Sequence, residues 1–368
     1  MLPYLNRGAV VFPGSEACAR AAGLAKFRIV REQVNRTPLE HDPFELWGQR
    51  VDELGLRLET SPVQPLIEQL YQELAQAGLV LRPSCYVANE WGCPDGQPLI
   101  GIPFWLVDPR LHAIEEDHAD DLEDDARILT GLRHEAGHAV NYAYKLYEHP
   151  EWDSVFGRYD QRYHDDYEPE PYSRKCVRHL PGWYAQKHPD EDFAETFAVW
   201  LTPGLSWREK YADWPALKKL EWLDKVMKEV GQNPPLVNPA DMVPDPLELA
   251  FTVGEYYTQR AATDAPPVQE IGAALDDDFR AAFNAEGLGT DAAQLVHERS
   301  RVIMHSVSSN TGSRLYVVKA LLDTVVGRLK TLGLRAVHGK EVDALISVTA
   351  MVSTLVTNYL RFGHLLPA

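Results

Sequence analysis

Apolar residues recur at helical spacing in several parts of the chain, and each part predicts a helix. The first begins at Ser61-Pro62-Val63-Gln64, where a capping residue, a proline at the first helical position and a glutamine three residues after the serine are typical of a helix start. Gly78 ends this helix. Further helices are expected over about 124–147, over 190–201, between Pro215 and Gly231, and over 315–332 and 341–362.

The stretch 79–107 instead has the pattern of strands. Cys85-Tyr86-Val87 and the segment 100–107 flank Pro94-Asp95-Gly96, a turn sequence, and this predicts an antiparallel hairpin. Pro103 cannot donate a ladder hydrogen bond, so the second strand is expected at an exposed edge. An edge over 101–107 could pair with an extended peptide, although an edge covered by the protein's own loops fits the sequence equally well.

Acidic residues are concentrated over 115–125, in the sequence EEDHADDLEDD, which holds eight acids. Negative charge is favoured near the positive end of a helix dipole, so this segment is interpreted as the solvated start of the helix that follows. A calcium loop does not fit, because the spacing and glycine of an EF-hand are missing.

The chain is expected to form two domains with an α+β fold. The segment 231–246, GQNPPLVNPADMVPDP, has five prolines and few periodic apolar residues, so we interpret it as a linker. The boundary is placed between residues 1–235 and 236–368, and the C-terminal domain is predicted to be mainly helical. Residues 1–60 indicate little beyond some short helix.

Charge and composition narrow the class of protein. With 368 residues and a formal net charge of -18, the chain lacks the excess of Lys and Arg that neutralises nucleic-acid phosphates, so no nucleic-acid partner is expected. The first thirty residues show no secretory signal, and the apolar stretch 344–356 is too short and too rich in Ser and Thr to span a bilayer. A cytoplasmic protein without a membrane partner is predicted.

The four cysteines are not the expected metal ligands. Cys18, Cys85, Cys93 and Cys176 show no paired CxxC spacing, and a disulfide framework would be unusual in a chain of this size without an export signal. Free buried thiols are expected instead.

The segment His134-Glu135-Ala136-Gly137-His138 carries the main chemical signal. Two imidazoles four residues apart lie on one face of a helix, where both can reach the same metal ion. Glu135 is about 100° further around the helix, an offset that in zinc peptidases of this pattern directs the carboxylate to the metal-bound water. The alternative is a pair of ordinary histidines.

A catalytic zinc usually has three protein ligands, so a third donor is needed. The extended motif HExxHxxGxxH is excluded because Asn141 and Tyr144 stand where it requires Gly and His. The best source is the acidic segment 190–195, in which Glu191 and Glu195 share one helix face. We assign Glu191 as the ligand and Glu195 as the acceptor that orients a zinc-bound imidazole, with the reverse order left open.

Asp190 and Asp192 lie in the same segment, and the preference of acids for the first turn of a helix accounts for both. Gly137, Ala194 and Ala198 are small enough to let the two helices approach closely, although ordinary helix packing explains them equally well.

These residues resemble a known family. LRHEAGHAVNYAY followed by HPDEDFAETFAVWL is similar to bacterial zinc-binding metallopeptidases that pair HExxH with a later EDxAExxA segment, and more broadly to gluzincins. The resemblance covers roughly residues 60–203, lacks the Cys-rich ribbon of some members and does not extend to the C-terminal third. It implies a zincin-like metallopeptidase domain, a Zn²⁺ ion held by His134, His138 and Glu191, and Glu135 as general base.

Tyr184 is the candidate oxyanion donor. Eight of the sixteen tyrosines lie between Tyr142 and Tyr184, and Tyr184 precedes Glu191 by seven residues. A similar tyrosine precedes the ligand glutamate in some gluzincin toxins. An ordinary packed or groove-lining tyrosine is the alternative.

The leading hypothesis is therefore a zinc metallopeptidase that hydrolyses peptide bonds in a peptide or protein substrate. A zinc-stabilised scaffold or regulatory binding protein without turnover is the second hypothesis, and a zinc hydrolase of non-peptide amides is the third. Glu135 favours an enzyme, because a purely structural site gains nothing from a base and is more often closed by four protein ligands. The oligomeric state is not indicated.

Overall fold

The computed structural model describes residues 43–119, 123–163, 167, 169–242, 244, 248–263, 271, 273–283 and 289–366. Over these residues the chain is mainly helical, with two small two-stranded sheets, so its composition is α+β. The expectations for residues 1–42, including Cys18, and for the acids at 120 and 121 fall outside the described residues. Cys85, Cys93 and Cys176 are free thiols, and Cys93 is buried.

In the first part of the chain, up to residue 263, the described residues form α1–α8, β1, β2 and the short 3-10 helices η1–η7. Its elements are η1 (Pro43–Leu46), η2 (Val51–Glu53), η3 (Leu58–Thr60), α1 (Gln64–Gln76), β1 (Ser84–Ala88), β2 (Leu99–Pro103), η4 (Phe104–Leu106), α2 (Pro109–Ala119), α3 (Asp125–Tyr144), η5 (Leu146–Glu148), α4 (Trp152–Val155), η6 (Pro181–Gln186), α5 (Pro189–Leu201), α6 (Trp207–Lys210), α7 (Leu217–Val230), η7 (Pro239–Asp241) and α8 (Val253–Thr263).

The C-terminal part is a bundle of helices with one short sheet. It contains α9 (Asp276–Ala282), β3 (Gly289–Asp291), α10 (Ala292–Glu298), α11 (Ser300–Thr311), α12 (Leu315–Leu332), β4 (Arg335–Val337) and α13 (Glu341–Phe362), and β3 pairs with β4 in antiparallel orientation. The expectation of a mainly helical C-terminal part is confirmed. The predicted helices 315–332 and 341–362 match α12 and α13.

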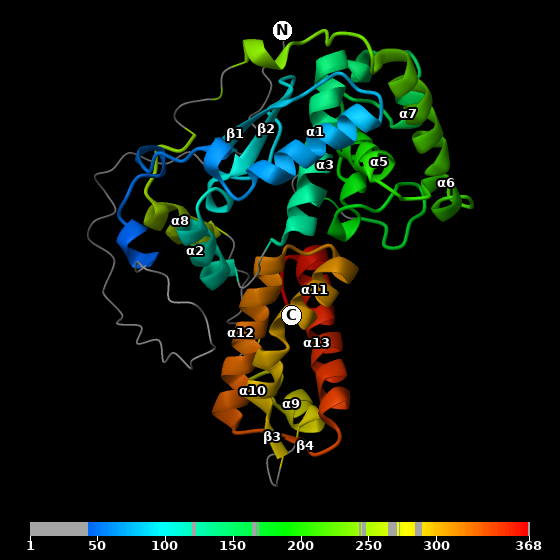
Figure 1. Ribbon diagram of the computed structural model, residues 1–368. Coiled ribbons are helices and arrows are strands. Elements are labelled where there is room, and N and C mark those ends of the chain that lie inside the picture. Colours follow the sequence, from blue (N-terminus) through cyan, green and yellow to red (C-terminus); the bar gives the residue numbers. More distant parts are fainter. Residues whose placement is uncertain are drawn as a thin grey trace.

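Helix α3 lies at the centre of the first part, in contact with α1, β2 and α5, while α7 covers the far side of α5 (Figure 1). Ile128, Leu132 and Val140 of α3 are buried in a large hydrophobic core. Phe251 and Tyr257, which follow the predicted boundary at residue 235, pack in this same core. A second large core joins α9–α13.

The helical bundle meets the first part mainly through α11 (Figure 1). Arg301 donates to Glu116 of α2 at 3.0 Å, and the hydroxyl of Tyr172 donates to Asn310 at 3.2 Å. At the end of α11 the backbones touch directly: a Cβ atom added to Gly182 of η6 would lie 2.9 Å from the Cα of Gly312.

The predicted antiparallel hairpin over 79–107 is wrong, because β1 and β2 pair in parallel, with Ser84 opposite Leu99. The expected turn exists: the N–H of Gln97 donates to the carbonyl of Pro94 at 2.9 Å, and the chain on either side pairs at Gly92 and Gly101. A further change of direction between Ala88 and Gly92 makes β2 run the same way as β1. The turn sequence therefore correctly predicted a reversal of the chain, but not which segment pairs with β2 across that reversal.

The expected exposed edge at 101–107 is also wrong. All five residues of β2 are buried, as is typical of parallel strands covered on both faces. β1 lies on one side of β2, and Gly92 accepts from the N–H of Gly101 on the other at 2.7 Å. Pro103 ends the strand instead of marking an edge, and η4 follows it directly.

Two predicted helix starts are displaced. Helix α1 begins at Gln64 with Pro65 in its first turn, and the Ser61 hydroxyl donates to the carbonyl of Leu58 instead of capping the helix. The acidic segment 115–125 is divided, because its first residues belong to the end of α2. Only its last part starts a helix, where the carboxylate of Asp124 accepts from the N–H of Arg127 at 2.9 Å.

Among the described helices, α13 is long and apolar enough to cross a membrane, by length and composition alone. The stretch 344–356, expected to be too short for a span, thus lies within a helix of sufficient length. Val348, Val352 and Val356 of α13 are buried in the second core, and 28% of the most apolar 18 residues of the helix are buried. A core helix of a soluble protein can meet the same criterion. The predicted cytoplasmic location stays a prediction.

Candidate metal centre

Helix α3 positions both histidines of the His134-Glu135-Ala136-Gly137-His138 motif. Asp124 caps its start, and Lys145, in the left-handed conformation with φ 50°, ends it. The predicted helix 124–147 is thus confirmed, with its end three residues earlier. His134, Glu135 and His138 are all buried, with 2–7% of their surface exposed.

Helix α5 faces α3 and carries the acidic segment. The ring of His188 caps this helix by accepting from the N–H of Asp190, and Pro189 occupies its first turn. The two helices cross at Gly137, where an added Cβ atom would lie 2.7 Å from the Cα of Ala194. Two small residues therefore bring the backbones close enough for a carboxylate of α5 to reach the imidazoles.

The donor atoms of His134, His138 and Glu191 converge on one point. The Oε2 atom of Glu191 lies 3.1 Å from the Nε2 atoms of both histidines, which are 3.2 Å apart. A tetrahedral zinc ion with bonds of about 2.0–2.1 Å would separate its ligands by about 3.3 Å. The buried group could therefore hold a metal ion. Imidazole and carboxylate donors suit Zn²⁺ and several other transition metals.

Each imidazole has a second carboxylate behind it. The Nδ1 atom of His134 lies 3.1 Å from Glu195, whose carboxylate also accepts from the N–H groups of His179 and Leu180. The Nδ1 atom of His138 lies 3.1 Å from the Oδ2 atom of Asp190. The hydrogen bond to Glu195 fixes the tautomer of His134 and aims its Nε2 atom away from Glu195, as is common for metal-binding histidines. The Nδ1 atom of His138 has no hydrogen-bond partner among the described residues, so Asp190 acts on that ring through its charge.

Glu195 thus lies where the sequence placed the orienting acid, whereas Asp190 was expected only to favour the helix start. Asp190 also accepts from Asn141 and Tyr142 at 2.8 and 2.6 Å, so its carboxylate is fully occupied with α3. Asp192 contacts neither histidine ring and instead forms an ion pair with Lys219 of α7.

The cluster is strongly electronegative. Burial on its own would lower the pKa of both imidazoles, but the carboxylates outweigh it: the pKa of His138 is raised to about 9 by Asp190 and Glu191, and that of His134 is raised well above its usual value. Burial would raise the pKa of Glu191, yet the two imidazoles hold it well below its usual range. The pocket therefore stabilises positive charge, whether protons or a metal ion carry it.

Glu135 lies beside this cluster without belonging to the converging donors. Its carboxylate is close enough to act electrostatically on His134, Tyr86 and Tyr184. This placement follows from the helix geometry, since neighbouring residues are about 100° apart. A buried carboxylate next to the donors, but not among them, has the position of a general base.

Tyr184 reaches the centre from η6, where Gly182 and Trp183 have positive φ values of 81° and 56° and bend the chain. The ring of Tyr184 meets that of His134 edge to face, with centroids 5.6 Å apart. Burial, and then Glu191, raise the pKa of Tyr184 well above its usual value, so its phenol stays protonated and can donate a hydrogen bond. The structure thus brings Tyr184 together with the predicted ligands.

Sequence reasoning missed Tyr163. Its hydroxyl donates to the Oε1 atom of Glu191 at 2.6 Å, the oxygen that does not face the histidines. The density of tyrosines between Tyr142 and Tyr184 was the available signal, but nothing in their spacing distinguishes this one from its neighbours.

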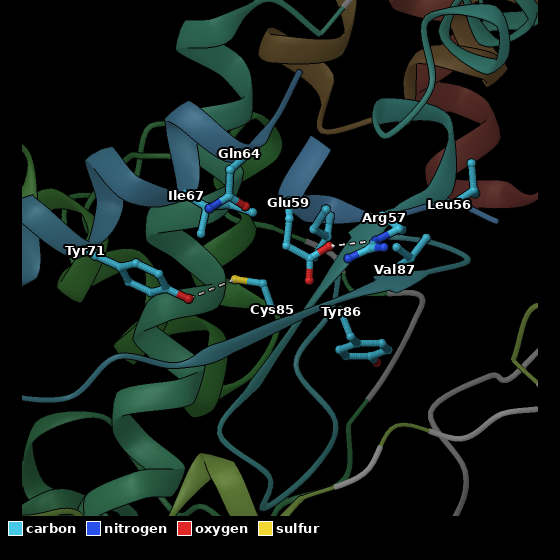
Figure 2. Close-up of a pocket in the computed structure, with 10 residues that line it drawn as sticks. Leu56, Arg57, Glu59, Gln64, Ile67, Tyr71, Cys85, Tyr86 and Val87 are labelled. Atoms are coloured by element: carbon cyan, nitrogen blue, oxygen red, sulfur yellow. Dashed lines mark hydrogen bonds and ion pairs between the residues drawn. The ribbon is translucent and has the colours of Figure 1, made fainter. Parts of the chain in front are cut away.

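A groove of about 370 Å³ runs along β1 on the side of α1 and η3, and no residue of β2 lines it (Figure 2). Tyr71, Cys85 and Tyr86 are among its lining residues. The pKa of Tyr86 is raised by burial and then by Glu248, and Glu135 makes a smaller electrostatic contribution.

Comparisons with protein-family models, curated proteins and solved structures found no match to this chain.

Proposed function

We propose that the protein is a zinc-dependent metallopeptidase with a zincin-like first domain. The observation that carries the proposal is the convergence of two Nε2 atoms and one carboxylate oxygen within 3.1–3.2 Å, with Glu135 adjacent to the donors. Three protein donors leave a fourth position open, as in catalytic zinc sites, whereas structural sites usually have four protein ligands. His134, His138 and Glu191 would hold the ion, which would supply Lewis acidity to a water molecule and a carbonyl group.

Side chains of the protein carry out the proton transfers and the charge stabilisation. Glu135 takes the proton of the attacking water and passes it to the leaving amine. The protonated phenol of Tyr184 donates to the oxyanion that develops on the carbonyl oxygen. Glu195 holds the imidazole of His134 in one tautomer, and the charge of Asp190 favours positive charge at His138.

Peptide substrates are supported by the groove beside β1. An extended chain can add to the edge of a sheet, and the groove adjoins β1 while β2 is enclosed between β1 and Gly92. Strand addition to this sheet would therefore use β1 in place of the segment 101–107. We propose a cytoplasmic peptide or protein as the substrate.

The substitution Glu135→Gln tests the function. It should leave zinc bound at the level of the unaltered protein and lower hydrolysis of a peptide library by roughly 10²–10⁴-fold, because it removes the base without removing a donor. Metal content is measured by mass spectrometry and cleavage by peptide sequencing. Glu221→Gln, on the exposed side of α7, is the matched control and should change neither quantity.

Two results would count against the proposal. Unchanged hydrolysis by the zinc-loaded E135Q variant would contradict the role of Glu135. Stoichiometric zinc in the unaltered protein, together with no cleavage of any library member, would favour a scaffold or a hydrolase of other amides.

A further inference from the structure

The two oxygens of Glu191 have different surroundings. Oε2 faces the histidines, 3.1 Å from each Nε2 atom, whereas Oε1 accepts the hydroxyl of Tyr163 at 2.6 Å. This length is typical of a hydrogen bond from a hydroxyl to a charged carboxylate, one of the stronger kinds in proteins. Oε1 is therefore already committed to Tyr163 when Oε2 is available to a metal.

This matters because a carboxylate can bind a metal through one oxygen or through both. A second bond from Oε1 would occupy the position that a catalytic site leaves for water. The Tyr163 hydroxyl competes directly with that second bond. Without this hydroxyl, Glu191 would be free to rotate its second oxygen toward the ion.

Tyr163 is itself held against the start of α5. Its ring lies 5.3 Å from the ring of His188, and the ammonium group of Lys187 lies 4.4 Å from its centroid. His188 contacts the chain near both residues of the Tyr163–Glu191 hydrogen bond. Its Nδ1 atom caps α5, which carries Glu191, and its Nε2 atom lies 3.2 Å from the carbonyl of Gln161, which is close to Tyr163 in the chain. Glu191 and Tyr163 are thus both anchored to the start of α5.

Tyr163 and the candidate oxyanion donor Tyr184 share a neighbour: the ammonium group of Lys187 lies 4.4 Å from the ring centroid of Tyr163 and 5.4 Å from that of Tyr184.

From these contacts we propose that Tyr163 is a positioning residue that restricts Glu191 to a single donor oxygen and so keeps one coordination position open. The inference rests on the proposed metal centre, but not on the identity of the substrate. It concerns a hydroxyl that would never touch the metal.

The test compares Tyr163→Phe with the unaltered protein after loading with Co²⁺, whose visible absorption weakens as its coordination number rises from four to five. Y163F should show the weaker, five-coordinate spectrum, and its zinc affinity should fall roughly 10-fold to 100-fold, as for other residues that support ligands. Tyr167→Phe is the matched control. It removes a hydroxyl that donates to the carbonyl of Gly182 at 2.9 Å, so the cobalt spectrum should stay unchanged.

A second comparison tests whether Tyr163 acts through Glu191. In a Glu191→Ala background the accepting oxygen no longer exists, so adding Y163F should change cobalt affinity less than twofold. An unchanged spectrum and affinity in Y163F would overturn the inference, as would an equal loss of affinity in both backgrounds. If the unaltered protein binds neither ion, the proposed metal centre itself fails. If the unaltered protein binds metal and Y163F changes neither the cobalt spectrum nor the affinity, only the role of Tyr163 is refuted.

Discussion

At the scale of single residues, the centre is built in two shells around His134 and His138. Glu191 faces their Nε2 atoms, and Glu195 and Asp190 stand behind their Nδ1 atoms. Every one of these three acids comes from α5, so removing any of them alters the charge of the site, but only one removes a donor. Their substitutions should therefore have unequal effects.

Glu191→Ala should lower metal occupancy far more than Glu195→Ala does, because it deletes one of three donors. Glu195→Ala keeps the donors and should weaken affinity roughly 10-fold to 100-fold, since it frees the tautomer of His134. Metal-to-protein ratios after dialysis against buffered zinc measure both. Retention of zinc by E191A together with its loss from E195A would reverse the assigned roles.

Sequence alone located His134, Glu135 and His138 because four-residue spacing on a helix is a local property. It also identified Glu191 and Glu195, since both follow from one helical face near a helix start. The roles of Tyr163 and Asp190 could not be predicted from the sequence. Their roles depend on where the loop at 163 and the α3–α5 crossing place them, which no spacing within the chain encodes.

At the scale of elements, the site depends on the close crossing of α3 and α5. Gly137 lies between the two histidines in the sequence, and the backbone of Ala194 occupies the space that a Cβ atom at this position would need. Backbone atoms give way far less readily than a flexible side chain, so even a methyl group at this position should force the helices apart. That separation would also move Glu191 away from the imidazoles.

Gly137→Ala should destabilise the protein by about 1–3 kcal/mol and weaken metal binding, as overpacking of a core does. Gly327→Ala, in the interior of α12 with no atom within 4 Å of the added Cβ, is the control and should stabilise by about 0.5–1 kcal/mol. Urea unfolding monitors both. Equal effects of the two substitutions would show that the crossing tolerates a side chain.

Helices were more predictable than strands in this chain. The ends of α12 and α13 coincide with Gly333 and Gly363, both in the left-handed conformation that favours glycine, so the stop signals are local. The pairing of β1 with β2 is not local, because a second reversal near Gly92 separates the turn from β1. The uninterrupted apolar run from Leu99 to Ile102 was the unused sign of a strand buried on both faces.

At the scale of the whole molecule, the candidate metal centre lies in the first part of the chain, and the C-terminal bundle contacts that part mainly through α11. The contact of Gly312 with Gly182 lies in the same short helix that carries Tyr184. All nine tryptophans of the chain precede residue 236, so tryptophan fluorescence reports only on the part that contains the site.

Metal removal should consequently affect the two parts differently. Metal at about 100 times its dissociation constant adds about 2.7 kcal/mol to the free energy of unfolding, equivalent to roughly 5–10 °C for a part of this size. A chelator should lower the transition seen by tryptophan fluorescence by that amount. Circular dichroism at 222 nm, which also reports the helices of the bundle, should retain a component that the chelator does not shift. A fluorescence transition insensitive to chelation would contradict a metal centre in the first core.

The concentration of the site on two helices has a further consequence for protein engineering. Both histidines, Glu135 and the three acids around them lie on α3 and α5, so the arrangement is portable in principle as a helical pair. A host scaffold would need to reproduce the Gly137–Ala194 crossing and to supply one phenol in the place of Tyr163. Grafting these two helices onto an unrelated bundle would reveal how much of a metal centre a single helix crossing can specify.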